Sequence, residues 1–271
     1  MARSRLASLI RSHGMAAILA IAATAAAPAQ TLTNPSYSAQ SVVHAATQTA
    51  QALAPNTIAT IYGTNLSFDT VAAGTSTVTD STLPQSLDGV TVVVEGITAN
   101  LFFVSPTQIN FLIPYLLAPG TVSLFVAHDS LAGPLVQLQL NSTAPGLFVY
   151  NGFILATHLN GSLISAAAPA RPGEIIVVYV AGLGWTSPNT DAGRLVTSAA
   201  SIVLAAQTQV LLDGTACPQS SLLYVGLAPG FAGLYQINMI VPPMTPVNPE
   251  LRVQVGAQIS PPGTLLALQP Q

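Results

Sequence analysis

Few side chains in this sequence can act as acids, bases or nucleophiles. Four histidines, nine acidic residues and one cysteine are spread over 271 residues. The nearest approach to a hydrolase triad is His128-Asp129-Ser130. Three consecutive side chains cannot converge on one another, and no Gly-x-Ser-x-Gly motif presents a nucleophilic serine. We therefore predict no catalytic residues and a non-enzymatic protein.

Metal and thiol chemistry also find little support. A single cysteine, Cys217, forms neither an intrachain disulfide nor a cysteine-based metal site. No His-x-x-x-His pair and no Asp-x-Asp-x-Asp loop occurs, so we predict no metal and no cofactor, although calcium held by distant loops stays open. An exported hydrolase with a site at a module interface also stays open, with His158 or Glu174 as candidate residues.

Trp185 is the candidate ligand-binding residue. This single tryptophan lies between a Gly-Leu-Gly and a Thr-Ser-Pro segment, which places it on or beside a loop. An exposed ring there could stack on a sugar or fill a protein pocket. The competing interpretation is that it caps one end of a sandwich core, because lone tryptophans are usually largely buried.

A seven-residue motif occurs twice in the sequence, and this repeat indicates the architecture that must position these residues. The two copies are Gln108-Ile109-Asn110-Phe111-Leu112-Ile113-Pro114 and Gln236-Ile237-Asn238-Met239-Ile240-Val241-Pro242. A second shared phrase runs from Pro55 and from Pro172, an offset of 172 − 55 = 117 residues. The same order of phrases with a near-constant offset is typical of a tandem duplication.

The copies differ by one insertion. The Asp-Gly turns are offset by 118 residues and the repeated phrases by 128, so the second copy holds 128 − 118 = 10 extra residues. We place them within Cys217 to Gly226 or at the neighbouring segment 230–233. The recurring polar residues are interpreted as structural, with the amides holding the backbone of a neighbouring loop. They are Tyr62, Tyr179, Gln108, Asn110, Gln236 and Asn238.

Short runs rich in Val, Leu, Ile and Thr, bounded by Gly, Pro, Asn or Asp, predict β-strands throughout. The sequence predicts an all-β protein of two tandem immunoglobulin-like β-sandwich modules. In the repeated strand Ile109, Phe111 and Ile113 alternate toward the core. The predicted strands are 91–95, 121–127, 135–140, 174–180, 201–204, 209–212 and 251–255. The predicted organisation is an arm or linker at 30–52, modules at 53–147 and 171–260, a linker at 148–170 and a tail at 261–271.

Residues 1–29 have the features of a signal peptide. Arg3, Arg5 and Arg11 precede an Ala-rich apolar run that is too short to span a bilayer, and cleavage is expected after Ala29. The remaining chain carries three arginines, no lysine and nine acids, for a net charge of 3 − 9 = −6. So few cations disfavour nucleic acid as a partner. We expect a secreted, periplasmic or cell-surface protein with no integral membrane span after cleavage.

Several phrases in one order carry a family resemblance. They begin at Leu53, Leu101, Pro169, Tyr179 and Tyr224, and together they cover about residues 50–258. The chain resembles a C-terminal domain family expanded in Solibacter and other Acidobacteria. The segment 63–66 also resembles the opening of an IPT/TIG immunoglobulin-like domain. The resemblance implies an exported β-sandwich and brings no established catalytic residues with it.

Three classes of function follow from these patterns. The leading one is an exported, non-enzymatic β-sandwich that binds an extracellular protein or polysaccharide. The second is the hydrolase with a site between the modules. The third is an outer-membrane-associated structural protein, which the 50% hydrophobic content suggests.

Overall fold

The computed structural model describes residues 33–190, 193–243 and 246–269. Within these ranges the only helical elements are three 3-10 turns, η1 (Ala39–Ser41), η2 (Ala205–Gln207) and η3 (Gln219–Ser221). None of the described helices has the length and hydrophobicity needed to span a bilayer. The predicted signal peptide, residues 1–29, lies outside the described residues. Thr33–Gln271 belong to one compact unit.

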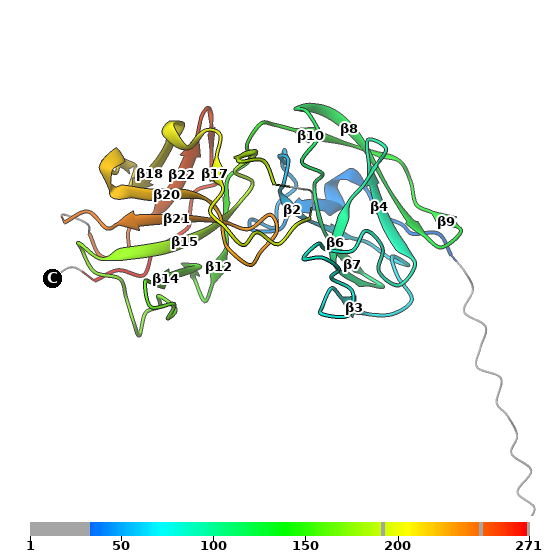
Figure 1. The fold of residues 1–271 in the computed structure, drawn as a ribbon, viewed down its shortest axis with the longest axis horizontal. Coiled ribbons are helices and arrows are strands. Elements are labelled where there is room, and N and C mark those ends of the chain that lie inside the picture. Colours follow the sequence, from blue (N-terminus) through cyan, green and yellow to red (C-terminus); the bar gives the residue numbers. More distant parts are fainter. Residues whose placement is uncertain (1–32, 191–192, 244–245, 270–271) are drawn as a thin grey trace, which may run out of the picture. The chain divides into compact units, whose positions relative to one another are not determined.

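The first half of this unit is a sandwich of two antiparallel sheets (Figure 1). One sheet has the order β1-β2-β7-β6-β3 and the other the order β10-β8-β4-β5, with β9 paired to β8. The strands are β1 (Val42–His44), β2 (Ile58–Tyr62), β3 (Val71–Ala72), β4 (Val90–Val94), β5 (Ile97–Thr98), β6 (Asn100–Ser105), β7 (Gln108–Leu112), β8 (Gly120–His128), β9 (Leu131–Ala132) and β10 (Val136–Leu140).

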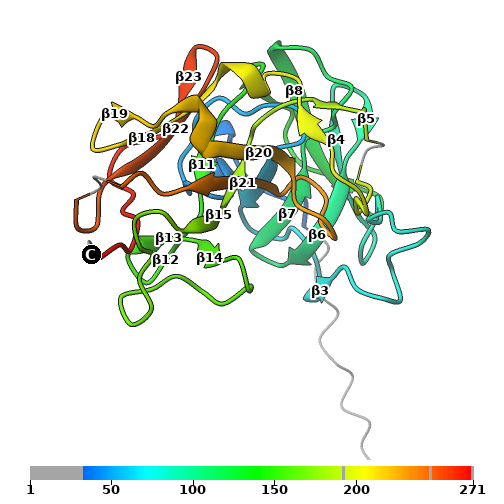
Figure 2. The ribbon, with the colours of Figure 1, turned by 60° about the vertical axis from the view of Figure 1, so that its left-hand side comes forward.

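The second half repeats this arrangement. One sheet has the order β11-β15-β21-β20-β17-β16, with β14 also paired to β15, and the other has the order β19-β18-β22-β23. The strands β12 and β13 form a separate hairpin, which lies beside β14 in both views (Figure 2). The strands are β11 (Gly146–Leu147), β12 (Val149–Tyr150), β13 (Phe153–Ile154), β14 (Ala156–His158), β15 (Ile175–Ala181), β16 (Thr186–Ser187), β17 (Ser201–Ile202), β18 (Thr208–Leu212), β19 (Thr215–Ala216), β20 (Leu222–Leu227), β21 (Tyr235–Ile240), β22 (Leu251–Val255) and β23 (Gln258–Ile259).

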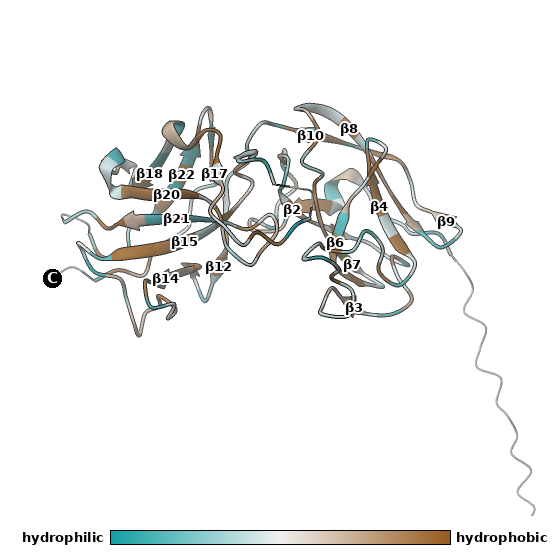
Figure 3. Ribbon diagram, viewed as in Figure 1, coloured by the Kyte–Doolittle hydropathy of each residue, from teal (hydrophilic) through white to brown (hydrophobic). Residues whose placement is uncertain are grey.

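The predicted all-β sandwich fold is confirmed, and the alternation in the repeated phrase explains its cores. Ile109, Phe111 and Ile113 are fully buried in the first core, and their equivalents Ile237, Met239 and Val241 are fully buried in the second. Hydrophobic colour accordingly follows strands of both halves, such as β4 and β15 (Figure 3). Each half buries its own apolar set, because a strand with a period of two offers one face to a core.

Segments that the sequence suggests are connections contribute strands and core residues. The predicted arm, 30–52, holds β1, which pairs with β2, and the predicted linker, 148–170, holds β14, which pairs with β15. Leu266 and Leu268, in the predicted tail, are buried in the second core. The sheets use the backbone groups of the first two segments to satisfy those of β2 and β15, and the tail adds apolar side chains to the core. The exact module boundaries stay predictions.

The ten extra residues of the second copy are split between two places. Leu101 pairs with Phe111 and Leu222 pairs with the equivalent Met239, so the offset from β6 to β20 is 222 − 101 = 121, and 121 − 118 = 3 of these residues precede β20. The other 128 − 121 = 7 lie in the loop between β20 and β21. In that loop Ala232 is buried against Leu83 and Leu112 of the first half. The larger part of the insertion therefore builds a contact between the two sandwiches.

Candidate ligand-binding site

Two histidines occupy the same position in the two sheets. His44 faces Ala59 across β1 and β2, and His158 faces Ile176 across β14 and β15. Ala59 and Ile176 are themselves equivalent, since 176 − 59 = 117, the offset of the repeat. The duplication therefore includes these two strands and places one histidine at the end of each.

His44 is fully buried and neutral. Its Nε2 lies 3.0 Å from the carbonyl oxygen of Ala144, and its Nδ1 accepts a hydrogen bond from the backbone of Ala46 at 3.2 Å. A Cβ on Gly146 would collide with the ring, so glycine is required for this close approach. Burial lowers the pKa of His44 to about 4, although the hydrogen bond to Ala144 acts in the opposite direction. Such a ring is a packing element and takes no part in acid-base chemistry near neutral pH.

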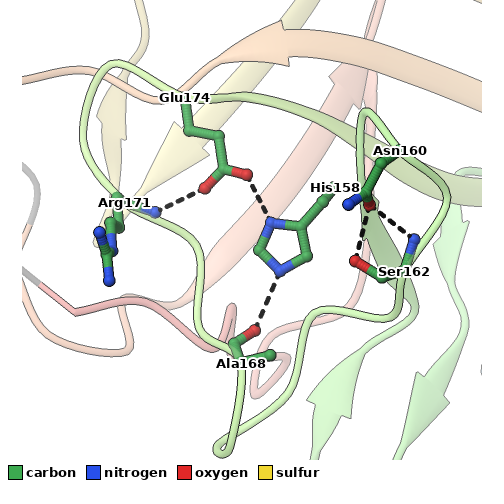
Figure 4. Close-up of polar contacts among 6 residues, drawn as sticks. All are labelled: His158, Asn160, Ser162, Ala168, Arg171 and Glu174. Atoms are coloured by element: carbon green, nitrogen blue, oxygen red, sulfur yellow. Dashed lines mark hydrogen bonds and ion pairs between the residues drawn. The ribbon is translucent and has the colours of Figure 1, made fainter.

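His158 is partly exposed and lies between two acceptors (Figure 4). Its Nδ1 pairs with Glu174 Oε1, and its Nε2 lies 3.2 Å from the carbonyl oxygen of Ala168. A neutral imidazole has one N–H and can donate to only one of these oxygens, whereas an imidazolium donates to both. Each ring nitrogen thus already has an oxygen partner, which leaves none for a nucleophile or a substrate proton.

Glu174 keeps a hydrogen bond that both copies share. In the first copy Thr57 Oγ1 accepts the backbone N–H of Ala54 at 3.0 Å, and in the second Glu174 Oε2 accepts that of Arg171 at 3.0 Å. The positions are equivalent, because 174 − 57 and 171 − 54 both equal 117. The longer glutamate side chain adds a second oxygen, and that oxygen holds His158.

Two hollows adjoin the His158–Glu174 pair. An open cleft of about 590 Å³ is lined by His158, Arg171, Glu174 and the segment 167–169. A smaller cavity of about 280 Å³ is lined mainly by apolar groups, with Tyr150 and Phe153 on one side and residues 163–167 on the other. Ala167 lines both hollows. The second copy therefore combines a polar cleft with an apolar cavity at one edge.

The β12–β13 hairpin has exposed apolar side chains, and one of them, Tyr150, lines the smaller cavity. Val149 is 52% exposed and Tyr150 is 57% exposed, and Tyr150 lies opposite Phe153 in the hairpin. Exposed apolar side chains beside a preformed cavity are typical of binding sites. The sequence alone does not single out Tyr150, because a Val-Tyr pair is common in any β-strand.

Trp185 is held at the contact between the two halves. Its indole N–H donates to the carbonyl oxygen of Tyr115 at 2.7 Å, and its ring is half-buried. The contact agrees with a packing role, and ligand binding by Trp185 stays a prediction. Thr143 makes a neighbouring contact of the same kind, donating to the carbonyl oxygen of Val255 at 3.1 Å.

The recurring amides form the same hydrogen bond in both copies. Gln108 Nε2 donates to Asn110 Oδ1, and Gln236 Nε2 donates to Asn238 Oδ1, each at 2.9 Å. The sequence suggested that these amides hold the backbone of a neighbouring loop. In the structure each glutamine instead bonds to an asparagine of its own strand. Tyr62 pairs in register with Gln108, and Tyr179 pairs in register with Gln236. Alternation puts these residues on the face turned away from the core, where each glutamine bonds its asparagine and the Tyr62 hydroxyl donates to Gln48 Oε1 at 2.7 Å.

The surroundings of His128 and Cys217 do not suit catalysis. His128 is buried against the ring of Phe68, and its Nε2 lies 3.9 Å from the exposed Asp129 carboxylate. Cys217 lines a different cavity, of about 300 Å³, and burial raises the pKa of its thiol to about 11. Within the described residues, no group of three or more His, Cys, Asp or Glu side chains could hold a metal ion.

Comparison with known proteins gives only distant structural similarity. No protein-family model and no curated protein matches the chain. The full extracellular region of plexin A4 is 12% identical with a TM-score of 0.29, and the match covers 89% of this chain and 19% of that one. A Bacteroides ovatus mixed-linkage glucan utilization locus protein, SGBP-B in complex with a mixed-linkage heptasaccharide, is 11% identical with a TM-score of 0.30, covering 81% and 43%. The chain spans less than half the length of both proteins, and TM-scores this low say nothing about what it binds.

Proposed function

We propose that the protein is an exported, non-enzymatic β-sandwich protein that binds an extracellular polysaccharide or protein. The observation that carries the proposal is the β12–β13 hairpin, where Tyr150 stays more than half exposed beside an apolar cavity. A tyrosine at such a rim offers a rigid ring for stacking and a hydroxyl for hydrogen bonding. Export rests on the predicted signal peptide, and membership of the Acidobacteria family rests on the shared sequence phrases.

The geometry of the titratable groups supports the non-enzymatic part of the proposal. The hydrolase alternative needs a base whose free nitrogen faces a nucleophile or water. The ring of His158, its best candidate, has an acceptor at each nitrogen instead. A thiol with a pKa near 11, as at Cys217, is also a poor nucleophile at neutral pH.

Arrays of glycans and envelope proteins test the proposal on the exported chain. Tyr150→Ala should lower the affinity for the bound ligand about tenfold or more, since a stacked ring contributes roughly 1–3 kcal/mol. Tyr62→Ala is the matched control, because Tyr62 is an exposed tyrosine of the first sandwich. Full affinity of Tyr150→Ala, or turnover of esterase, glycosidase or peptidase substrates, would contradict the proposal.

A further inference from the structure

A guanidinium without a carboxylate partner lines the cleft beside the tyrosine rim. Both oxygens of Glu174 are occupied, one by His158 Nδ1 and the other by the backbone N–H of Arg171. The Arg171 guanidinium, in contrast, points away from this carboxylate (Figure 4). Within the described residues it has neither an ion pair nor a side-chain hydrogen bond. Arg171 therefore brings to the cleft a guanidinium that no carboxylate of the described residues binds.

This charge stands out in a chain so poor in cations. Three arginines lie in the described residues and the whole sequence has no lysine. Arg252 donates from Nε and from a terminal nitrogen to the carbonyl oxygen of Ser260, so its guanidinium serves the fold. Arg194 lies at the contact between the halves, where its backbone forms an antiparallel β-bridge with Thr82. Arg171 instead lines an open cleft.

The chemistry of the two hollows selects one kind of ligand. A guanidinium pairs well with a carboxylate, because its planar N–H groups match the two oxygens. The adjoining cavity offers the Tyr150 and Phe153 rings to a less polar group, with Ala167 between the two hollows. A chain of sugar rings that bears carboxylates presents both features in succession. One arginine neutralises too few phosphates to retain nucleic acid.

We infer that the site binds an acidic polysaccharide, with a sugar carboxylate at Arg171 and a neighbouring ring against Tyr150. The inference rests on the proposed binding function and narrows its ligand. His158 and Glu174 act as positioning residues, since Glu174 anchors the turn that begins at Arg171 and His158 anchors Glu174. An acidic peptide is the competing partner. Its carboxylates are carried on flexible side chains, however, whereas each carboxylate of a uronate chain is attached to a ring that can pack against Tyr150.

Calorimetric titration of the exported chain with three uronate oligosaccharides of different linkage tests the inference. Each is compared with its carboxyl-reduced, neutral counterpart. We expect the uronates to bind at least tenfold more tightly, and Arg171→Gln to remove that difference while leaving the affinity for the neutral forms unchanged. Affinity for the uronates should also fall as salt is raised, because the pair is solvent-accessible.

Two controls keep the outcome interpretable. Arg252→Gln removes the same charge outside the cleft and should leave binding unchanged, and thermal melts show that each variant is folded. Absence of uronate binding, equal affinity for the neutral forms, tighter binding of poly-glutamate, or full affinity of Arg171→Gln would each overturn the inference. A neutral glycan or a protein that binds in a Tyr150-dependent way would then leave the proposed function standing.

Discussion

His44 and His158 occupy equivalent positions in the two sandwiches but have opposite surroundings. The strand end at His44 is sealed by Ala144 and Gly146, so the ring is buried and neutral. The strand end at His158 opens into a cleft, where Glu174 supplies the charge that Thr57 lacks in the first copy. The difference teaches that one copy packs this edge into the fold, whereas the other leaves it open as a cleft.

Loop length contributes to the same difference. From His44 to Pro55 the chain advances 55 − 44 = 11 residues, and from His158 to Pro172 it advances 172 − 158 = 14. The three additional residues lie in the segment that borders both hollows. Loops tolerate such insertions at small entropic cost, so a duplicated edge can change its use without a change of fold.

The largest expected effect on stability comes from removing the buried imidazole of His44. His44→Ala should lower the free energy of unfolding by about 2–4 kcal/mol, because it leaves a cavity and an unpaired Ala144 carbonyl. His158→Ala should cost no more than about 1 kcal/mol, since its ion pair is partly exposed to solvent. Denaturant unfolding of the two variants measures this contrast, and equal losses would contradict the assignment of the two edges.

The buried histidine should also make stability depend on pH. Its pKa is about 4 in the folded protein, against 6.5 for the free side chain, so the unfolded chain binds more protons between these values. Stability should therefore fall as pH drops from about 6.5 to about 4, by about 3 kcal/mol in total. His44→Gln should flatten the profile in that window. A variant with the same slope as the original chain would show that another group is responsible.

The amide pairs allow a finer comparison between the copies. Asn110 Oδ1 accepts from Gln108 and also from Thr60 Oγ1 at 3.0 Å, whereas the position equivalent to Thr60 is Val177. Asn110→Ala should therefore destabilise the protein by about 1 kcal/mol more than Asn238→Ala. Thermal melts of the two single variants measure the difference. Thr60→Val should reduce it, and a gap that survives this change would exclude the Thr60 hydrogen bond as its cause.

Trp185 gives the smallest expected effect on ligand affinity. Trp185→Phe keeps a ring but removes the hydrogen bond to the Tyr115 carbonyl, which should cost about 1 kcal/mol of stability. Affinity for the ligand should stay unchanged. A tenfold loss of affinity in a folded Trp185→Phe protein would instead support the sequence-based prediction that Trp185 binds the ligand.

Most of the fold could be predicted because its signals are local. Short β-branched runs between prolines and glycines mark the strands, and 251–255 coincides with β22. The alternation in the repeated phrase identifies its buried face. The equivalence of His44 and His158 could not be predicted, since Val-Val-His and Ala-Thr-His share one residue and only the strand register aligns them.

The candidate site was visible only in part. His158 and Glu174 were selected as residues near the linker, yet nothing in the sequence indicates that a turn brings them together. Tyr150 and Arg171 were not selected, because exposure and the proximity of two hollows depend on packing across segments distant in sequence. The interpretation of 148–170 as a linker also concealed the hairpin, whose two strands are only two residues long.

The central claim is that the second sandwich binds the ligand at the edge that the first sandwich seals. Hydrogen exchange of the exported chain, with and without a bound uronate oligosaccharide, tests this claim most directly. We predict slower exchange in 149–174 on binding and unchanged exchange in 36–57, the equivalent edge of the first sandwich. Protection of 36–57, or of the contact around Trp185, with no change in 149–174 would contradict it.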